Sequence, residues 1–228
     1  LKIHIPMRRI VLMTLLALAL GATAEEPAYK THKPAPFYYQ RASLFEILPA
    51  DTTDIIMLGN SITNGCEWHE LFRRPEIKNR GISSDGIDGV SARIDPVVAG
   101  RPAKIFLMIG VNDIARGMPV DTIAAKILDL ADHIAAESPR TALYVQSVLP
   151  YNASFGRYQG LFGKESWITA LNEHLNRNAA EHGYVYIDLF SSFADEEGRL
   201  DTRYTNDGLH LTGDGYMLWR SMLEPYLD

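Results

Sequence analysis

The sequence predicts an α/β protein built as a three-layer α/β/α sandwich around a five-stranded parallel sheet. Three observations predict this fold: short apolar runs recur along the chain, longer amphipathic segments separate them, and polar segments flanked by glycine follow the apolar runs. Apolar runs joined by helices are typical of parallel strands that are buried on both faces. With 228 residues the chain has room for one full core, so we expect a single domain.

The first 24 residues differ from the rest of the chain. Arg8 and Arg9 precede an apolar run over residues 10–20, and small residues occupy positions 22 and 24. A basic segment, a short apolar segment and an A-x-A site together are typical of a secretory signal peptide. The run is also shorter than the roughly 20 residues that a membrane-spanning helix needs. We therefore expect cleavage after Ala24 and export to the periplasm or the extracellular space.

The regular elements are expected in a domain over residues 37–228, after a polar, proline-rich and flexible leader over 25–36. Apolar residues at near-helical spacing predict a first helix over 37–48. Two longer amphipathic segments predict helices over 120–138 and 165–183. Short apolar runs predict the strands 54–59, 77–81, 104–110, 142–148 and 184–189.

The net negative charge of the chain makes some classes of binding partner less favourable than others. The formal net charge is −6, and because residues 1–24 carry three basic residues and no acidic one, their removal would take it to −9. An acidic chain is a poor partner for nucleic acid or for an anionic membrane surface. A small-molecule or carbohydrate substrate therefore fits better, and we expect no stable membrane anchor. Nothing in the sequence indicates the oligomeric state.

Polar residues that can carry chemistry follow the expected strands. Ser61 follows the first strand, Gly81 ends the second, Asn112 follows the third, and Asp207 and His210 follow the fifth. In an open parallel sheet, sites form at the edge where the carboxyl ends of the strands meet. The sequence therefore predicts that these five residues gather at one edge of the sheet.

Ser61 is the candidate nucleophile. A serine hydroxyl is weak at neutral pH and needs an adjacent imidazole held in place by a carboxylate. Asp207 and His210 are three residues apart and supply that pair on the expected edge. Donors for an oxyanion hole are the backbone N–H groups of Ser61 and Gly81 and the side-chain amide of Asn112. This set of residues predicts hydrolysis of an ester.

These residues resemble the four sequence blocks of the GDSL or SGNH hydrolase family. The matching segments are GNS with Ser61, NRG with Gly81, GVND with Asn112 and DGLHLT with His210, and the match covers residues 54 to about 220. The resemblance implies the flavodoxin-like SGNH hydrolase fold, a triad completed by Asp207, no cofactor, and ester hydrolysis through an acyl-enzyme. The chain is most similar to the branches of platelet-activating factor acetylhydrolase and of bacterial carbohydrate acetylesterases. It departs from the family's G-D-S in carrying an amide, Asn60, where the family has aspartate.

Each of these residues also has a plainer interpretation. Ser61 fits a helix cap, Asp207 and His210 an ordinary loop pair, and Gly81 and Asn112 turn residues. Their order along the chain, each next to its expected strand, favours catalysis over five unrelated roles. GNSITNG matches neither a phosphate-binding loop nor a G-x-S-x-G elbow, because no lysine follows the second glycine and position 63 is threonine.

Other nucleophiles and metals are disfavoured. Cys66 is the only cysteine, so the sequence predicts no internal disulfide, and its side chain either fills space or serves as a thiol nucleophile. The histidines other than His210 have no partner at ligand spacing, so we expect no metal site.

A loop over residues 151–166 gives the best indication of the substrate. Tyr151, Phe155, Arg157 and Tyr158 lie in it among glycines and are candidate substrate contacts, either stacking on a sugar ring or lining an acyl pocket. The plainer interpretation is an aromatic cover over the helix beneath. We expect short acyl esters, acetyl above all, on carbohydrates. A lysophospholipid or thioester substrate, or a non-catalytic carbohydrate-binding domain of the same fold, stays open.

Overall fold

The computed structural model describes residues 34–228. The expected signal peptide over 1–24 and nearly all of the expected leader over 25–36 lie outside the described residues, so both stay predictions. Within residues 34–228, none of the helices combines the length and the apolar character needed to span a bilayer.

Five parallel strands form one sheet in the order β2-β1-β3-β4-β5. The strand order reverses between β1 and β3, and ligands of open α/β sheets bind beyond the carboxyl ends of the strands at such a point. The predicted fold class and all five predicted strands are confirmed. The strands are β1 (Ile55–Gly59), β2 (Ile77–Gly81), β3 (Lys104–Met108), β4 (Ala142–Gln146) and β5 (Val185–Ile187).

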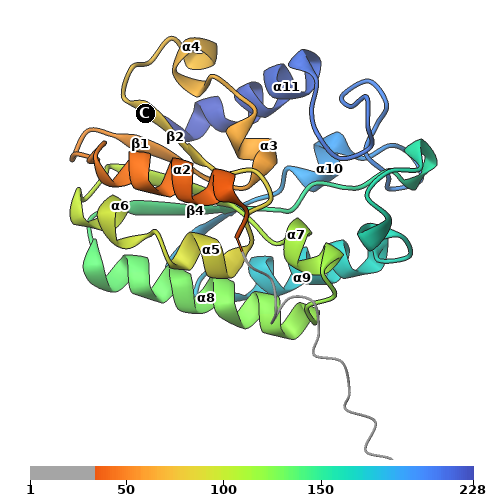
Figure 1. Ribbon diagram of the computed structural model, residues 1–228, viewed down its shortest axis with the longest axis horizontal. Helices are drawn as coiled ribbons and strands as arrows, with labels where there is room; N and C mark the ends of the chain where they lie inside the picture. The colour runs from red at the N-terminus through yellow and green to blue at the C-terminus, as the bar shows by residue number, and fades with distance from the viewer. Residues whose placement is uncertain (1–33) are drawn as a thin grey trace, which may run out of the picture.

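Helices cover both faces of the sheet. In Figure 1, α5, α8 and α9 lie along one face, and α4 and α11 lie along the other. The helices that precede β3 are α2 (Pro36–Glu46), α3 (Ser61–Asn64), α4 (Trp68–Phe72), α5 (Ile87–Ser91) and α6 (Asp95–Ala99). Those that follow β3 are α7 (Val111–Ala115), α8 (Val120–Glu137), α9 (Glu165–Asn178), α10 (Phe190–Phe193) and α11 (Gly213–Leu223), with the single 3₁₀ turns η1 (Ala153–Phe155), η2 (Gln159–Leu161) and η3 (Glu224–Tyr226).

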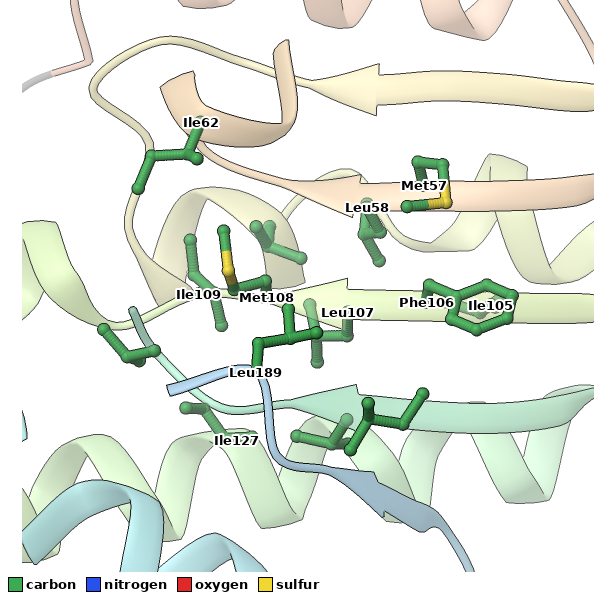
Figure 2. Close-up of a cluster of buried hydrophobic side chains, with 14 of the residues drawn as sticks. Met57, Leu58, Ile62, Ile105, Phe106, Leu107, Met108, Ile109, Ile127 and Leu189 are labelled. Carbon is green, nitrogen blue, oxygen red and sulfur yellow. The ribbon is translucent and has the colours of Figure 1, made fainter. Parts of the chain in front are cut away.

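The core lies between the central strands and the helices on either side. Every residue of β1 is buried, which explains why its sequence is a continuous apolar run rather than an alternating one. Figure 2 shows side chains of β1 and β3 clustered with Ile127 of α8 and with Leu189, which follows β5. Burying a side chain of this size contributes about 1.5–3 kcal/mol to the stability of the fold. This cluster therefore stabilises β1 and β3, the two strands between which the strand order reverses.

Some element boundaries differ from those expected. The first helix begins at Pro36, the last residue of the expected leader, because proline fits the first turn of a helix, where its missing N–H is not needed. The third strand ends at Met108, because the chain turns at Gly110, which has φ 126° and is the N-cap residue of α7. The fourth ends at Gln146, because the side chain of Asn172 binds the N–H and the C=O of Val148 in place of a neighbouring strand.

Several elements were not predicted at all. The short helices after β1, β2 and β3 have too few residues to show a helical period. Helix α11 buries Trp219 and Leu223 although its first turn contains two glycines. Glycine lowers helix propensity, and here tertiary packing outweighs that preference.

Candidate active site

Ser61 is the first residue of α3, directly after β1. Strand β1 leads into this helix through Asn60, whose side-chain Oδ1 accepts the N–H of Ile62 at 3.0 Å and caps the helix. The backbone N–H of Ser61 donates to no acceptor within residues 34–228 and therefore stays available to a ligand. The local sequence thus exposes both the hydroxyl and the N–H of Ser61 at the switch in strand order.

A tight turn fixes Asp207 and His210. Gly208 has φ 87°, and a Cβ there would lie 2.4 Å from the carbonyl oxygen of Asn152, so only glycine fits. Oδ1 of Asp207 accepts the backbone N–H groups of Leu209 at 2.9 Å and of His210 at 2.8 Å. The aspartate is therefore held by the same turn that positions the histidine.

The three predicted catalytic residues form a continuous chain of hydrogen bonds. Oγ of Ser61 lies 2.9 Å from Nε2 of His210, and Nδ1 of His210 lies 2.8 Å from Oδ2 of Asp207. Burial raises the pKa of Asp207, but hydrogen bonds from Tyr158 and from His210 outweigh it, so the pKa lies below its usual value. The aspartate is ionised and can only accept, so Nδ1 carries the proton and Nε2 offers its lone pair to Ser61.

Asn112 lies in α7, the helix after β3. Its Nδ2 donates one hydrogen to the carbonyl of Asp85 at 2.8 Å, which orients the amide. The amide carries a second hydrogen that this bond leaves free. Asn112 and the Ser61 N–H therefore remain available as oxyanion donors.

Gly81 has a different role from the expected one. Its N–H donates to Oδ1 of Asn79 at 2.8 Å, so it is not free to bind an oxyanion. A Cβ at Gly81 would lie 2.3 Å from the backbone nitrogen of Asn64, which shows that glycine is needed here for close packing of α3 on β2. The NRG segment thus supports the nucleophile's helix.

Asn79 is a supporting residue that sequence reasoning missed. Its Nδ2 lies within hydrogen-bond distance of the carbonyls of Thr63, Asn64 and Cys66, the closest being Cys66 at 2.8 Å. It therefore caps the end of α3, as Asn60 caps its start. The side chain of a strand residue gives no sequence signal for such a contact.

Ser84 was also missed. It is the exposed residue of the loop between β2 and α5 and has φ 65°, which is uncommon for a residue other than glycine. Its carbonyl accepts a hydrogen bond from Arg116, and its N–H donates to no acceptor within residues 34–228. The feature that distinguishes Ser84 is its positive φ, and a backbone angle is seen only in the structure, not in the sequence.

The loop over 151–166 provides only part of the expected substrate surface. Tyr151 is buried and its hydroxyl donates to the carbonyl of Arg157, so its ring is not open to a ligand. The hydroxyl of Tyr158 donates to Asp207 at 2.6 Å. Arg157 is exposed and Phe155 half-buried, and these two remain available to a substrate.

Cys66 fills space in the core. It is buried, and burial raises the pKa of its thiol to about 12, so the thiolate that a nucleophile requires is disfavoured. The thiol interpretation is therefore the weaker of the two.

The fold and the site together define an ester hydrolase with a serine at the switch in strand order. The sequence profile described as the GDSL-like lipase/acylhydrolase family matches residues 57–218. The chain belongs to this family, and the resemblance recognised from its sequence segments is confirmed.

Solved structures agree with this assignment. A platelet-activating-factor-like protein from Streptococcus pneumoniae is 27% identical, with a TM-score of 0.77 over 84% of this chain and 93% of that one. An acylhydrolase-like protein from Bacteroides fragilis is 23% identical, with a TM-score of 0.74 over 86% and 98%. A GDSL-like lipase from Bacteroides thetaiotaomicron is 23% identical, with a TM-score of 0.73 over 83% and 96%. No curated protein matches the sequence.

Proposed function

We propose that this ester hydrolase is a serine esterase that removes short acyl groups, acetyl above all, from carbohydrates. The observation that carries the catalytic part is the unbroken path from Asp207 through His210 to the Ser61 hydroxyl, with bonds of 2.8 and 2.9 Å. Such a path is what an alcohol needs to become a nucleophile at neutral pH.

The reaction has two halves. Nε2 of His210 takes the proton of Ser61 as Oγ attacks the ester carbonyl, and the protonated imidazole then gives that proton to the leaving alcohol. Water, deprotonated by the same nitrogen, attacks the acyl carbon. The bond from that carbon to Oγ then breaks, and Nε2 returns the proton to Oγ, which releases the acid and restores the Ser61 hydroxyl. The reaction consumes the ester and one water molecule and releases the alcohol and the acid.

In both halves, negative charge develops on the carbonyl oxygen. The Ser61 N–H and the free amide hydrogen of Asn112 stabilise it, and the N–H of Ser84 takes the place that was expected for Gly81. Ser84 supports this role because its N–H is uncommitted and because Asn112 is bonded to its neighbour Asp85. Each donor of this kind contributes about 3–4 kcal/mol to transition-state stabilisation.

The preference for a carbohydrate is supported by a cavity beside the loop that orients Asn112. The cavity measures about 340 Å³, and its walls include Tyr38, Tyr39, Ser84, Asp88 and Arg116. The lining is mostly apolar, but its tyrosine rings can stack on a sugar ring, and Ser84, Asp88 and Arg116 can form hydrogen bonds to hydroxyl groups.

The catalytic claim is tested with a chromogenic acetyl ester and the purified protein. We expect Ser61→Ala to lower kcat by at least about 10³-fold, since members of a triad act as a unit. The matched control is Ser221→Ala, which removes an exposed hydroxyl that donates to the carbonyl of Leu218 within α11. Equal rates for wild type and Ser61→Ala would exclude the mechanism. If both rates equal the rate without protein, a non-catalytic binding domain is favoured instead.

The substrate claim needs a separate comparison. We expect release of acetate from acetylated xylan or acetylated sialic acid, and a fall in kcat/KM as the acyl chain lengthens from acetyl to octanoyl. A rate on lysophospholipid or on long-chain thioesters equal to that on acetyl esters would contradict the acetyl preference while leaving the serine mechanism intact.

A further inference from the structure

Tyr158 contacts both the carboxylate and the imidazole of the proposed triad. Its hydroxyl lies 2.6 Å from Oδ2 of Asp207 and 3.0 Å from Nδ1 of His210. Its ring meets the His210 ring edge to face, with centroids 5.4 Å apart. We propose that Tyr158 is a positioning residue, which holds the Asp207 carboxylate and thereby fixes the tautomer and the orientation of His210. This inference rests on the proposed function.

The hydrogens at this junction can be assigned from chemistry. A phenol has one hydrogen, and the ionised carboxylate accepts it, because burial and the bond to Asp207 raise the pKa of Tyr158 to about 12 and keep it neutral. The phenol oxygen can then only accept from Nδ1. The Nδ1–H of His210 is therefore shared between Oδ2 at 2.8 Å and the phenol oxygen at 3.0 Å. Both contacts favour the tautomer that leaves Nε2 free for Ser61.

Contacts of the neighbouring backbone fix the position of Tyr158. Tyr158 has φ 54° and ψ 52°, a left-handed conformation that costs roughly 1–2 kcal/mol outside glycine. The next residues form η2, which packs on α7, and a Cβ at Gly160 would lie 2.6 Å from the carbonyl oxygen of Ala115. Nζ of Lys164 donates to the carbonyl of Ile114 at 2.9 Å. The strained residue is therefore fixed against the helix that carries Asn112.

The same loop is tied to the triad turn at a second point. The N–H of Asn152 donates to the carbonyl of Gly208 at 2.9 Å, and its Nδ2 donates to the carbonyl of Leu200 at 2.8 Å. Tyr158 therefore approaches Asp207 from a loop that is itself fastened to the Asp207–His210 turn. The contact between Tyr158 and Asp207 is therefore supported by the hydrogen bond between Asn152 and Gly208, which an accidental surface contact would not need.

The Tyr158 hydroxyl also affects the electrostatic interaction between the Asp207 carboxylate and the His210 imidazole. By donating to Oδ2, Tyr158 spreads the negative charge of Asp207, so the carboxylate stabilises a protonated imidazole less than it otherwise would. The other groups that face this junction are the hydroxyls of Ser61 and Thr205 and the guanidinium of Arg157, which acts on Tyr158. Removing the phenol hydroxyl should therefore strengthen the attraction between the Asp207 carboxylate and a protonated imidazole.

The test is Tyr158→Phe, which keeps the ring and removes the hydroxyl. We expect kcat on the chromogenic acetyl ester to fall roughly ten- to hundredfold, the loss typical of a hydrogen bond to a charged group, with KM little changed. We also expect the acid limb of the kcat/KM profile to move to higher pH. The matched control is Tyr184→Phe, which removes a buried hydroxyl bonded to the carbonyl of Leu175, away from the triad. It should leave the acid limb in place.

A double-mutant cycle shows whether Tyr158 acts through Asp207. If it does, adding Tyr158→Phe to Asp207→Asn should cost less than threefold, because the carboxylate that it positions is gone. An unchanged acid limb in Tyr158→Phe, or the same fold-loss in both backgrounds, would overturn the inference. If Ser61→Ala is inactive in the same assay, such a result leaves the proposed function standing.

Discussion

Asn60 shows at the scale of one residue how the chain departs from its family and still supports the helix that begins with the proposed nucleophile, Ser61. The family's aspartate is replaced by an amide, and the structure assigns that side chain to the cap of α3. Asparagine and aspartate cap helices about equally well, because either oxygen can accept the exposed N–H groups. The lost charge therefore does not remove the local support of Ser61.

We predict that Asn60→Ala lowers the free energy of unfolding by about 1 kcal/mol, because it removes the cap of the helix that begins with Ser61. Urea denaturation measures this loss. We also expect kcat to fall, since the serine is no longer fixed at the start of α3. Asn60→Asp is the matched variant: it retains the acceptor and should lose less stability and less activity than the alanine variant. Equal losses in the two would refute the cap as the important feature.

Residues also show where sequence reasoning ends. Ser61, Asp207 and His210 were predictable, because a nucleophile, a base and an acid have few possible residue types and must follow strands of one sheet. The engaged N–H of Gly81 and the hydroxyl of Tyr158 on Asp207 were not. Both depend on the direction in which a side chain points, and neither composition nor spacing encodes that direction.

At the scale of elements, Arg93 ties the ends of two strands to the loop that orients Asn112. It lies between α5 and α6 and is buried. It donates to the carbonyls of Gly59 at 3.1 Å and Arg80 at 2.8 Å, and to the carboxylate of Asp85 at 2.9 Å. Burial lowers the pKa of Arg93 and raises that of Asp85, so each ion depends on the other.

We predict that Arg93→Met destabilises the fold by about 3–5 kcal/mol, because it leaves the Asp85 carboxylate buried without its partner. Urea denaturation gives the loss. The double variant with Arg93→Met and Asp85→Asn no longer has the unpaired buried carboxylate, so part of the stability should be restored. A single variant within 1 kcal/mol of wild type, or a double variant no better than the single one, would contradict this interpretation.

Strands were easier to predict than helices. A strand buried on both faces is a short apolar run bounded by polar residues, and β1 and β3 have this form. Strand β2 is mostly polar, and β5 is buried only at Ile187. The helices α8 and α9 were long enough to show their period, whereas the four- and five-residue helices were not. Their positions are fixed by contacts with the sheet, such as those of Asn79 with α3, rather than by their own sequences.

At the scale of the whole molecule, the pH dependence of stability should reflect Asp113. This residue follows Asn112 and is buried, and both of its carboxylate oxygens accept the N–H of Ile87 at 3.2 Å. Burial raises the pKa of Asp113 to about 7, although the bonds from Ile87 and the charge of Arg116 oppose the shift. The folded state therefore holds a proton that the unfolded state releases near pH 4.

We predict that this group stabilises the fold below about pH 4 and that its contribution is lost as the pH rises to about 7. One pKa unit corresponds to about 1.4 kcal/mol, so the loss is at most about 4 kcal/mol. Asp113→Asn removes the titration, so its stability relative to wild type should rise between pH 4 and 8, as measured by urea denaturation at several pH values. A constant difference across that range would show that Asp113 does not titrate there.

The hydrogen bond between Ser61 and His210 joins residues 149 positions apart. In the proposed mechanism, the nucleophile follows the first strand, whereas its base belongs to a turn that follows the last strand. A chain that lacks the segment after β5 would therefore contain Ser61 without its base. We expect such a chain to carry its serine as an inert alcohol.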